Sequence, residues 1–551
     1  MKFQNYQQRW IQTLVKDSES ISKSRLRRGR DQRFILKSRS RSMAAPESRR
    51  EVHLPVWVFD RMKSLVAIIF LLAQSARGQF EQLFKNGTAN PRRIKEVREE
   101  ARKSNYNFRG NASIAKINPK MDSERSLEEV ETALVKVIGD VDGFDFLAKP
   151  PEGKEKNEHT VLIKVGVNWG TLGYPTVTSW ESVYAVTKMC LEEAKDREAN
   201  VRVIVGDESG IEIGLWAGMT MRNFEHTEVL HAAVLAGLEH AASLEVRNPG
   251  KFKGAGELLK RMREGHKVTL DDGDTLSKQM IDMAFQAGVE IIGFGSKDED
   301  FIRIPIPAGR KVKHFKQGIF VPRIVAEEVT DIINLPKPPG RHMIMGNTGL
   351  TGALKNYVGL LKASDRLSEL HGEGSPLVGS WNERGPGMGF HEKIVEIYLA
   401  FKDKERFSAA DMRRTISSLG PDFGDKIEVG AVIAAKDPVT LDAVAGAFLK
   451  KRYVEIGSWF DALKLGGDTF WEYLAGKTWL RNCTPFDLKS HIAANSYGIG
   501  PIDLDHIDFE GFESSGFRVR ELDTVAGYLQ DHQVITPITI VREAPVKMEL
   551  G

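Results

Sequence analysis

Residues 126–515 alternate between short apolar runs with strand character and longer amphipathic segments with helix character. Apolar runs such as HTVLIKVGVNWG (159–170) and NVRVIVGD (200–207) are followed by segments with helical periodicity. Strands that alternate with helices predict βαβ units, whose strands run parallel in a sheet covered on both faces. We therefore expect an α/β fold, with a mostly parallel, helix-covered sheet built from βαβ units.

Two features interrupt this alternation. The segments DFIRIPIP (300–307) and HFKQGIFV (314–321) flank Ala308-Gly309-Arg310 and predict a β-hairpin. Residues 208–275 are mostly polar with helical periodicity, and we interpret them as a helical insertion in the α/β domain.

The segments outside 126–515 have a different composition. Residues 1–50 hold 14 Lys/Arg and 4 Asp/Glu, and we interpret residues 1–61 as a basic, disordered extension. Residues 79–125 are expected to be an irregular linker and residues 516–551 a C-terminal extension. Because the basic surplus is confined to the N-terminus, we expect no nucleic-acid partner for the folded body.

Residues 62–78 resemble a secretory signal. Arg61 and Lys63 precede nine apolar residues, Leu65 to Ala73, and small residues follow. Nine residues rise only about 14 Å as a helix, too short for a bilayer core of roughly 30 Å. If translation starts at Met62, the chain is expected to be exported to a periplasmic or other extracytoplasmic location. The alternatives are a buried helix in a cytoplasmic protein and a membrane-anchored segment, with residues 62–78 as the only membrane contact.

Cysteine usage excludes several classes of site. The chain has two cysteines, Cys190 and Cys483, and no C-x-x-C motif. An iron–sulfur cluster normally needs four thiolates and a structural zinc site usually two or more at short spacing, so neither is expected. A disulfide framework is excluded too, whereas a single long-range bridge stays open.

Polar residues stand where the predicted strands end. In parallel α/β sheets, ligands bind beyond the carboxyl ends of the strands, so these residues are candidates for a site. They are Lys164 and Asn168 at the first strand, Asp207 after the second, and Lys337, Arg341 and His342 after the strand that contains Asn334.

A glycine-rich segment follows His342 and opens a predicted helix. It contains Gly346, Gly349 and Gly352, and the helix carries Lys355 in its first turns. Glycines allow close approach of backbone N–H groups to a ligand, and a helix N-terminus favours negative charge. The segment predicts an anion or phosphate cradle, although it is not a Walker A loop. The alternative is a tight strand-to-helix turn without a ligand.

Two aspartates lie at the start of the last long helix. Asp437 before Pro438 is typical of a helix N-cap, with a functional role as the alternative. Asp442 lies five residues on and does not share a helix face with Asp437, so the two alone do not predict a shared metal. His391-Glu392 begins like H-E-x-x-H, but Val395 replaces the second histidine.

Several of these segments together resemble the family called domain of unknown function 362. They are VLIKVGVNWG, VIVGD, INLPK with a following basic residue and histidine, TGALKNYVGLL and AKDPVTLDAVA, and they occur in order within residues 126–512. Arg341 replaces the second lysine usual in the family, and the cysteine-rich module of some relatives is absent. The resemblance implies these site residues: Lys164, Asp207, Lys337, His342, Lys355, Asn356, Asp411 and Asp437.

Three lysines together with carboxylates suit a small anionic ligand, and a divalent metal is compatible with this set. Our leading hypothesis is an enzyme acting on a small phosphorylated or carboxylated molecule, with Lys337, His342 and Asp207 as acid or base groups. The alternatives are a non-catalytic anion-binding, metal-binding or maturation protein, electron transfer through a partner's cluster, and a structural role. The sequence identifies no cofactor and no oligomeric state.

Overall fold

The structure of the chain is a computed structural model, and the residues it describes all fall in the compact unit Ala73–Gly551. The described ranges are 91–103, 106–119, 123–167, 173–208, 228–270, 273–294, 298–307, 312–342, 349–362, 365–366, 370, 388–416, 426–456 and 485–510. The predicted extensions 1–61 and 516–551 and the signal-like segment 62–78 lie outside the described residues.

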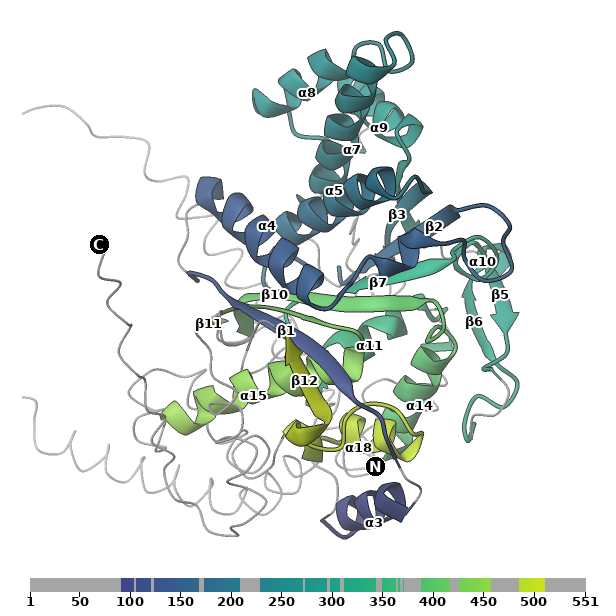
Figure 1. Cartoon of the computed structure of the whole chain (residues 1–551), viewed down its shortest axis with the longest axis vertical. Coiled ribbons are helices and arrows are strands. Elements are labelled where there is room, and N and C mark those ends of the chain that lie inside the picture. The colour runs from purple at the N-terminus through teal and green to yellow at the C-terminus, as the bar shows by residue number, and fades with distance from the viewer. Residues whose placement is uncertain are drawn as a thin grey trace, which may run out of the picture. The chain divides into compact units, whose positions relative to one another are not determined.

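One eight-stranded sheet organises the described residues (Figure 1). Its strands are β1 Gly110–Lys116, β2 Glu158–Val165, β3 Asn200–Glu208, β4 Val289–Phe294, β7 Asp331–Leu335, β10 Glu405–Ile416, β11 Lys426–Ala435 and β12 Ile507–Glu510. Their order across the sheet is β12-β1-β11-β10-β7-β2-β3-β4.

Most neighbouring strands of this sheet run parallel. The run β10-β7-β2-β3-β4 is parallel throughout, and β12 is parallel to β1. Only β11 breaks the pattern in this sheet, because it pairs antiparallel with both β10 and β1. The predicted α/β class with a mostly parallel sheet is therefore confirmed.

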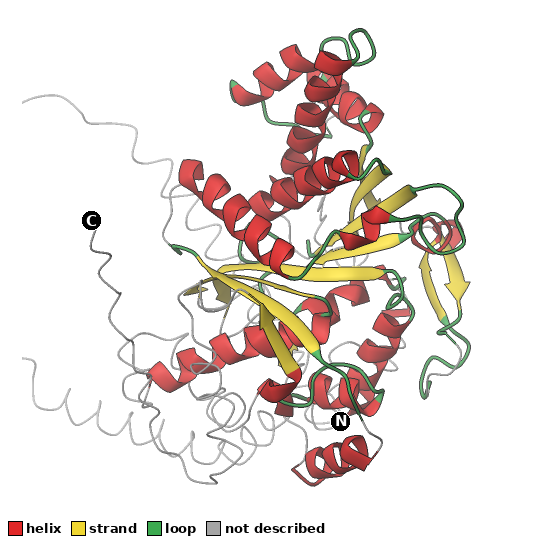
Figure 2. Ribbon diagram, in the orientation of Figure 1, coloured by secondary structure: helices red, strands yellow, loops and turns green. Residues whose placement is uncertain are grey.

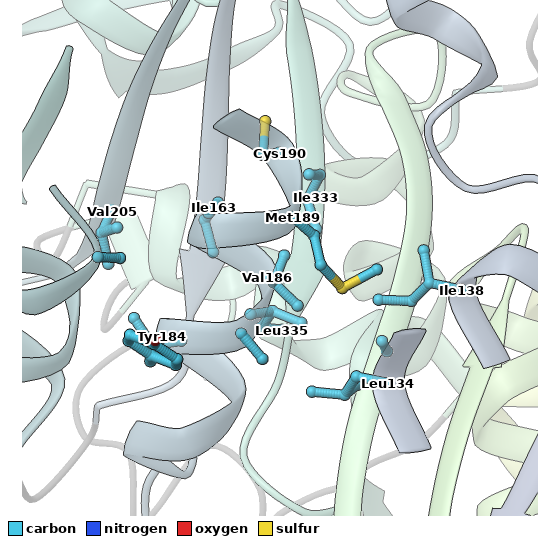
Figure 3. Close-up of a cluster of buried hydrophobic side chains, with 14 of the residues drawn as sticks. Leu134, Ile138, Ile163, Tyr184, Val186, Met189, Cys190, Val205, Ile333 and Leu335 are labelled. Atoms are coloured by element: carbon cyan, nitrogen blue, oxygen red, sulfur yellow. The ribbon is translucent and has the colours of Figure 1, made fainter. Parts of the chain in front are cut away.

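Helices cover both faces of the sheet, as Figure 2 shows. On one face, α4 Ser123–Asp140 and α5 Trp180–Asp196 pack on alternate strand residues such as Ile163, Val205 and Ile333. Figure 3 shows part of this core, with Leu134 and Met189 from the helices and Ile163 and Ile333 from the strands. The strand residues between these point to the other face of the sheet and contribute to a second core.

The second face carries the helices that follow the central strands. They are α11 Ala353–Asn356, η5 Tyr357–Leu360, α14 Met388–Leu399, α15 Pro438–Ile456 and α18 Lys489–Ser496. Leu162, Ile204 and Ile332 of the sheet pack here against Leu354 and Val395. Adjacent strand residues point to opposite faces, so each buried strand contributes alternate side chains to the two cores.

The described part of the connection between β3 and β4 holds three helices: α7 Glu228–Arg247, α8 Ala255–Arg263 and α9 Thr275–Gln286. Their helical character agrees with the expectation for residues 208–275. Among the described helices, α7 is the one long and apolar enough to cross a membrane by length and composition. Half of its apolar stretch is buried, and it packs against α5, α8 and α9, as a core helix does.

The remaining elements are short or lie at the edges. They are α3 Pro91–Lys103, η2 Asp145–Ala148, η4 Asp298–Asp300, β5 Phe301–Ile304, β6 Ile319–Pro322, α10 Arg323–Glu327, β8 Gly340–His342, β9 Gly349–Thr351, η7 Pro485–Asp487 and η8 Leu504–His506. β5 and β6 pair antiparallel, which confirms the predicted hairpin. β8 and β9 form a second antiparallel pair.

Residues 91–116 differ from the irregular linker that we expected over 79–125. They form α3 and β1, and β1 is a nearly fully buried strand of the main sheet. Its sequence, GNASIAK, is too short and too rich in small and polar residues to give a clear strand pattern. α3 packs against α18, where Arg98 forms an ion pair with Asp487 (3.0 Å).

Candidate functional site

A row of polar side chains crosses the centre of the sheet. Lys164 of β2 pairs in register with Asn334 of β7, and Asn334 pairs with Ser408 of β10. All three are fully buried, and their neighbours Leu162 and Ile332, two positions away on the same strands, belong to the core under α11 and η5. Strand alternation therefore points this polar row toward the same helices.

Lys164 of this row forms an ion pair with Asp207 of β3. The Lys164 Nζ atom lies 2.6 Å from Oδ1 of Asp207 and donates to the carbonyl of Val165 at 2.7 Å. The Asp207 Oδ2 atom accepts from the backbone N–H of Val167. The pair lies at the carboxyl ends of β2 and β3. Both side chains are at least 95% buried, so the pair is shielded from water.

Burial moves the two pKa values of this pair toward each other. Desolvation lowers the pKa of Lys164 from its usual value and raises the pKa of Asp207, while the attraction between the two groups opposes both shifts. Arg366, itself buried, adds a positive charge near both groups, and burial lowers its own pKa to about 10. Because burial disfavours the charged form of both groups, the charge of each depends on the presence of the other.

Asn356 of α11 holds the pair against the helix layer. Its Nδ2 donates to the carbonyl of Lys164 (3.1 Å) and to Oδ1 of Asn334 (2.8 Å), and its Oδ1 lies 3.5 Å from Lys164 Nζ. The backbone of η5 closes over the pair at Gly359, where a Cβ atom would lie 2.7 Å from the Asp207 carboxylate and 2.9 Å from Lys164 Nζ. Only glycine fits at this position without displacing the ion pair.

The hydrogen-bonded row continues to a buried glutamate. Asn334 Nδ2 donates to Oγ of Ser408 (2.9 Å), and Ser408 donates to Oε1 of Glu405 (2.7 Å). Burial raises the pKa of Glu405 to about 8, so this carboxyl group is largely protonated at neutral pH. Asp207, Lys164, Asn356, Asn334, Ser408 and Glu405 thus form one connected polar network.

Lys337 and Asn356 approach the same point at the end of β2. A Cβ atom at Gly166 would lie 2.9 Å from the backbone nitrogen of Lys337 and 3.1 Å from Oδ1 of Asn356. The side chain of Lys337 is buried, whereas that of Lys355 is half-buried and donates to Oγ1 of Thr351 at 3.4 Å. The structure therefore brings the Lys337 segment and α11 together at the carboxyl edge.

In the described part of the predicted anion cradle, at the start of α11, the backbone N–H groups bind a side chain of the same chain. Asp442 of α15 accepts hydrogen bonds from the backbone N–H groups of Ala353 (2.6 Å) and Leu354 (3.0 Å). A Cβ atom at Gly352 would lie 1.9 Å from Oδ1 of Asp442. Gly352 is thus needed for the close approach of the Asp442 carboxyl group to these two N–H donors.

Two aspartates implied by the family resemblance have structural partners. Asp437 caps α15, because its Oδ1 accepts from the backbone N–H groups of Val439 (3.0 Å) and Thr440 (2.9 Å). Asp411 forms a buried ion pair with Arg413 (2.7 Å), and Arg413 also pairs with Glu181 of α5 (2.9 Å).

The contact with α5 places Asp411 on the α4 and α5 face of the sheet, opposite the polar row. Asp411 therefore lies across the sheet from Lys164, and its role in a site stays a prediction. Its separation from the row follows from strand alternation, because Ser408 and Asp411 are three residues apart on β10.

The structure describes several other predicted site residues only in part or not at all. Asn168 and Gly346 lie outside the described residues, and for Arg341, His342 and Gly349 only the backbone in β8 and β9 is described. The described residues contain no cluster of His, Cys, Asp and Glu that could hold a metal ion. Cys190 is a buried free thiol, and burial raises its pKa.

Sequence reasoning missed residues whose role depends on contacts between distant segments. Ser408, Glu405, Arg366 and Asp442 were not among the predicted site residues, and Asn334 was noted only as part of a strand end. Asn334 could have been found as a polar residue inside the otherwise apolar run IINL of β7. Asp442 could not, because its partners lie 88 and 89 residues away in the chain.

Of the comparisons with known proteins, the one with family models found a match. No curated protein and no solved structure matches the chain significantly. Residues 273–447 match the family model described as Domain of unknown function (DUF362). This range includes β4, β7, β10 and β11 but not Lys164 or Asp207, and it is shorter than the range 126–512 of the predicted resemblance. The resemblance is thus confirmed: over residues 273–447, the chain carries a domain of the DUF362 family.

Proposed function

We propose that the chain is an enzyme that acts on a small phosphorylated or carboxylated molecule at the carboxyl edge of β2, β3 and β7. The observation that carries this proposal is the buried Lys164–Asp207 pair, whose pKa values are moved toward each other by desolvation. A carboxyl group whose pKa is raised by burial can hold and release a proton closer to neutral pH, which is what general acid–base catalysis requires.

The energetics of burial support a functional role for the pair. An apolar pair of similar volume in a protein interior is often as stable as a buried ion pair, or more stable. The neighbouring positions on the same face of these strands, Leu162 and Ile204, are apolar and fully buried, so the fold itself does not require charge here. Perturbed ionisable groups at the ligand-binding edge of an α/β sheet are candidates for catalysis.

In this proposal, Asp207 exchanges the proton with the substrate and Lys164 is a positioning residue that sets its proton affinity. Asn356 fixes the orientation of Lys164 through two contacts, one with the carbonyl and one with Nζ. Lys337 and Lys355 supply positive charge for the phosphate or carboxylate group of the substrate. A fixed network of this kind holds reacting groups in position before the substrate binds.

The test is turnover of a panel of phosphate monoesters and small carboxylic acids, followed by mass spectrometry. Asp207→Asn keeps the size of the side chain and removes its proton exchange, so we expect turnover to fall roughly 100-fold or more. Asp508→Asn is the control, because Asp508 forms an exposed ion pair with Arg109 at 2.5 Å. Equal rates for the two variants would contradict the proposal. Binding without any turnover by the unaltered chain would favour the alternative, a non-catalytic binding protein.

A further inference from the structure

His391 of α14 is a buried histidine whose ring has no polar contact among the described residues. Its side chain is 1% exposed, and neither Nδ1 nor Nε2 has a hydrogen-bond partner within the part of the chain that the structure describes. The ring packs edge-on against Phe390, with centroids 5.4 Å apart. Buried polar groups in proteins are nearly always hydrogen-bonded, so an unsatisfied imidazole indicates a missing partner.

Two lysines, Lys355 and Lys489, bring positive charge to this imidazole. α14 contacts both α11, which carries Lys355, and α18, which begins at Lys489 (Figure 1). Burial, and then the charges of Lys489 and Lys355, hold the pKa of His391 well below its usual value. The ring is therefore neutral, with one nitrogen that donates a hydrogen bond and one that accepts.

The acidic residues of the same helix are directed elsewhere. Glu392 pairs with Lys313 (2.6 Å) and His314 (2.9 Å). Glu396 accepts from backbone N–H groups of residues 313–315 and from the hydroxyl of Tyr497. The charges that bear on His391 are thus cationic, which disfavours a metal ion and favours an anion as the missing partner.

We propose that His391, Lys355 and Lys489 form a binding site for the phosphate group of a small ligand. Two lysines match the double negative charge of a phosphate monoester, and the imidazole N–H donates a hydrogen bond to one of its oxygens. The inference rests on the proposed function, because it locates the anionic group of that substrate. Lys355 is adjacent in the chain to Asn356, so a ligand held here lies beside the segment that contacts Lys164.

The experiment is titration of the full chain with inorganic phosphate, measured by calorimetry and by the ¹⁵N chemical shifts of the histidine rings. We expect His391→Phe to weaken phosphate binding about tenfold or more, because the variant loses a charge-assisted hydrogen bond. Its folding stability should be unchanged or higher, because the variant removes an unsatisfied buried polar group. Lys489→Met should weaken binding without loss of the fold.

His240→Phe is the matched control, because His240 is a half-buried histidine of α7. It should bind phosphate as the unaltered chain does. The inference is overturned if phosphate does not bind, or if it binds His391→Phe as tightly as the unaltered chain. It is also overturned if His391→Phe loses stability and retains phosphate binding, which would assign His391 a packing role. Phosphate binding that depends on His391, together with turnover indifferent to Asp207→Asn, would reject the proposed function alone.

Discussion

The buried pair of Lys164 and Asp207 makes a quantitative prediction for Lys164→Met. Methionine keeps the length and apolar character of the lysine stem but leaves the Asp207 carboxylate buried without its cation. Removal of one partner from a buried ion pair typically costs about 3–5 kcal/mol of folding free energy. We expect a loss of this size at pH 7 in urea unfolding followed by tryptophan fluorescence.

A second ion pair supplies the control for this prediction. Lys188 and Glu131 are also 2.6 Å apart, but their side chains are 31% and 25% exposed. Lys188→Met should therefore cost no more than about 1 kcal/mol. The loss in Lys164→Met should also diminish as the pH falls, because protonation removes the unpaired charge of Asp207. If the two variants lose the same stability, or if the loss in Lys164→Met does not depend on pH, the reasoning about the buried pair is refuted.

Three further predictions concern α11 and the N-terminal segment. Burial raises the pKa of Asp442 to about 7, above the value near 3.8 expected in the unfolded chain. Stability should therefore fall by up to about 4 kcal/mol as the pH rises from about 4 to 7, and Asp442→Asn should weaken this dependence in urea unfolding across that range. Gly352→Ala should destabilise by about 2 kcal/mol, because its Cβ displaces Asp442 from its two N–H donors. By the same assay, Gly139→Ala in α4, where nothing lies within 4 Å, should be neutral or stabilising. We also propose that residues 62–78 direct export, so residues 62–90 fused to alkaline phosphatase should give activity outside the cytoplasm. An inactive fusion would contradict export.

The fold could be predicted largely from sequence because its signals are local. The central parallel strands are apolar runs, and β3 and β11 were expected to within a few residues of their observed bounds. β1 was not predicted, because a buried strand composed mainly of Ala, Ser and Asn carries no hydrophobic pattern. Its place in the sheet depends on pairing with β11, which is more than 300 residues away.

The candidate site could be predicted only in part, because its assembly depends on contacts between distant segments. Lys164 and Asp207 end neighbouring strands, and the rule for ligand sites in parallel sheets selects both. The glycine-rich turn, in contrast, suits an external phosphate and an internal carboxylate equally well. Asp442 contacts this turn because α15 packs against α11, and no local sequence pattern encodes that packing.

The most direct test of the central claim is a crystal structure of the chain soaked with tungstate, an oxyanion with the shape and charge of phosphate and strong anomalous scattering. We predict an anomalous peak at the carboxyl edge, within hydrogen-bond distance of a His391 ring nitrogen and on the same side of the sheet as Lys164 and Asn356. Peaks confined to other surfaces, or no peak at millimolar tungstate, would contradict the existence of an anion site in this part of the molecule.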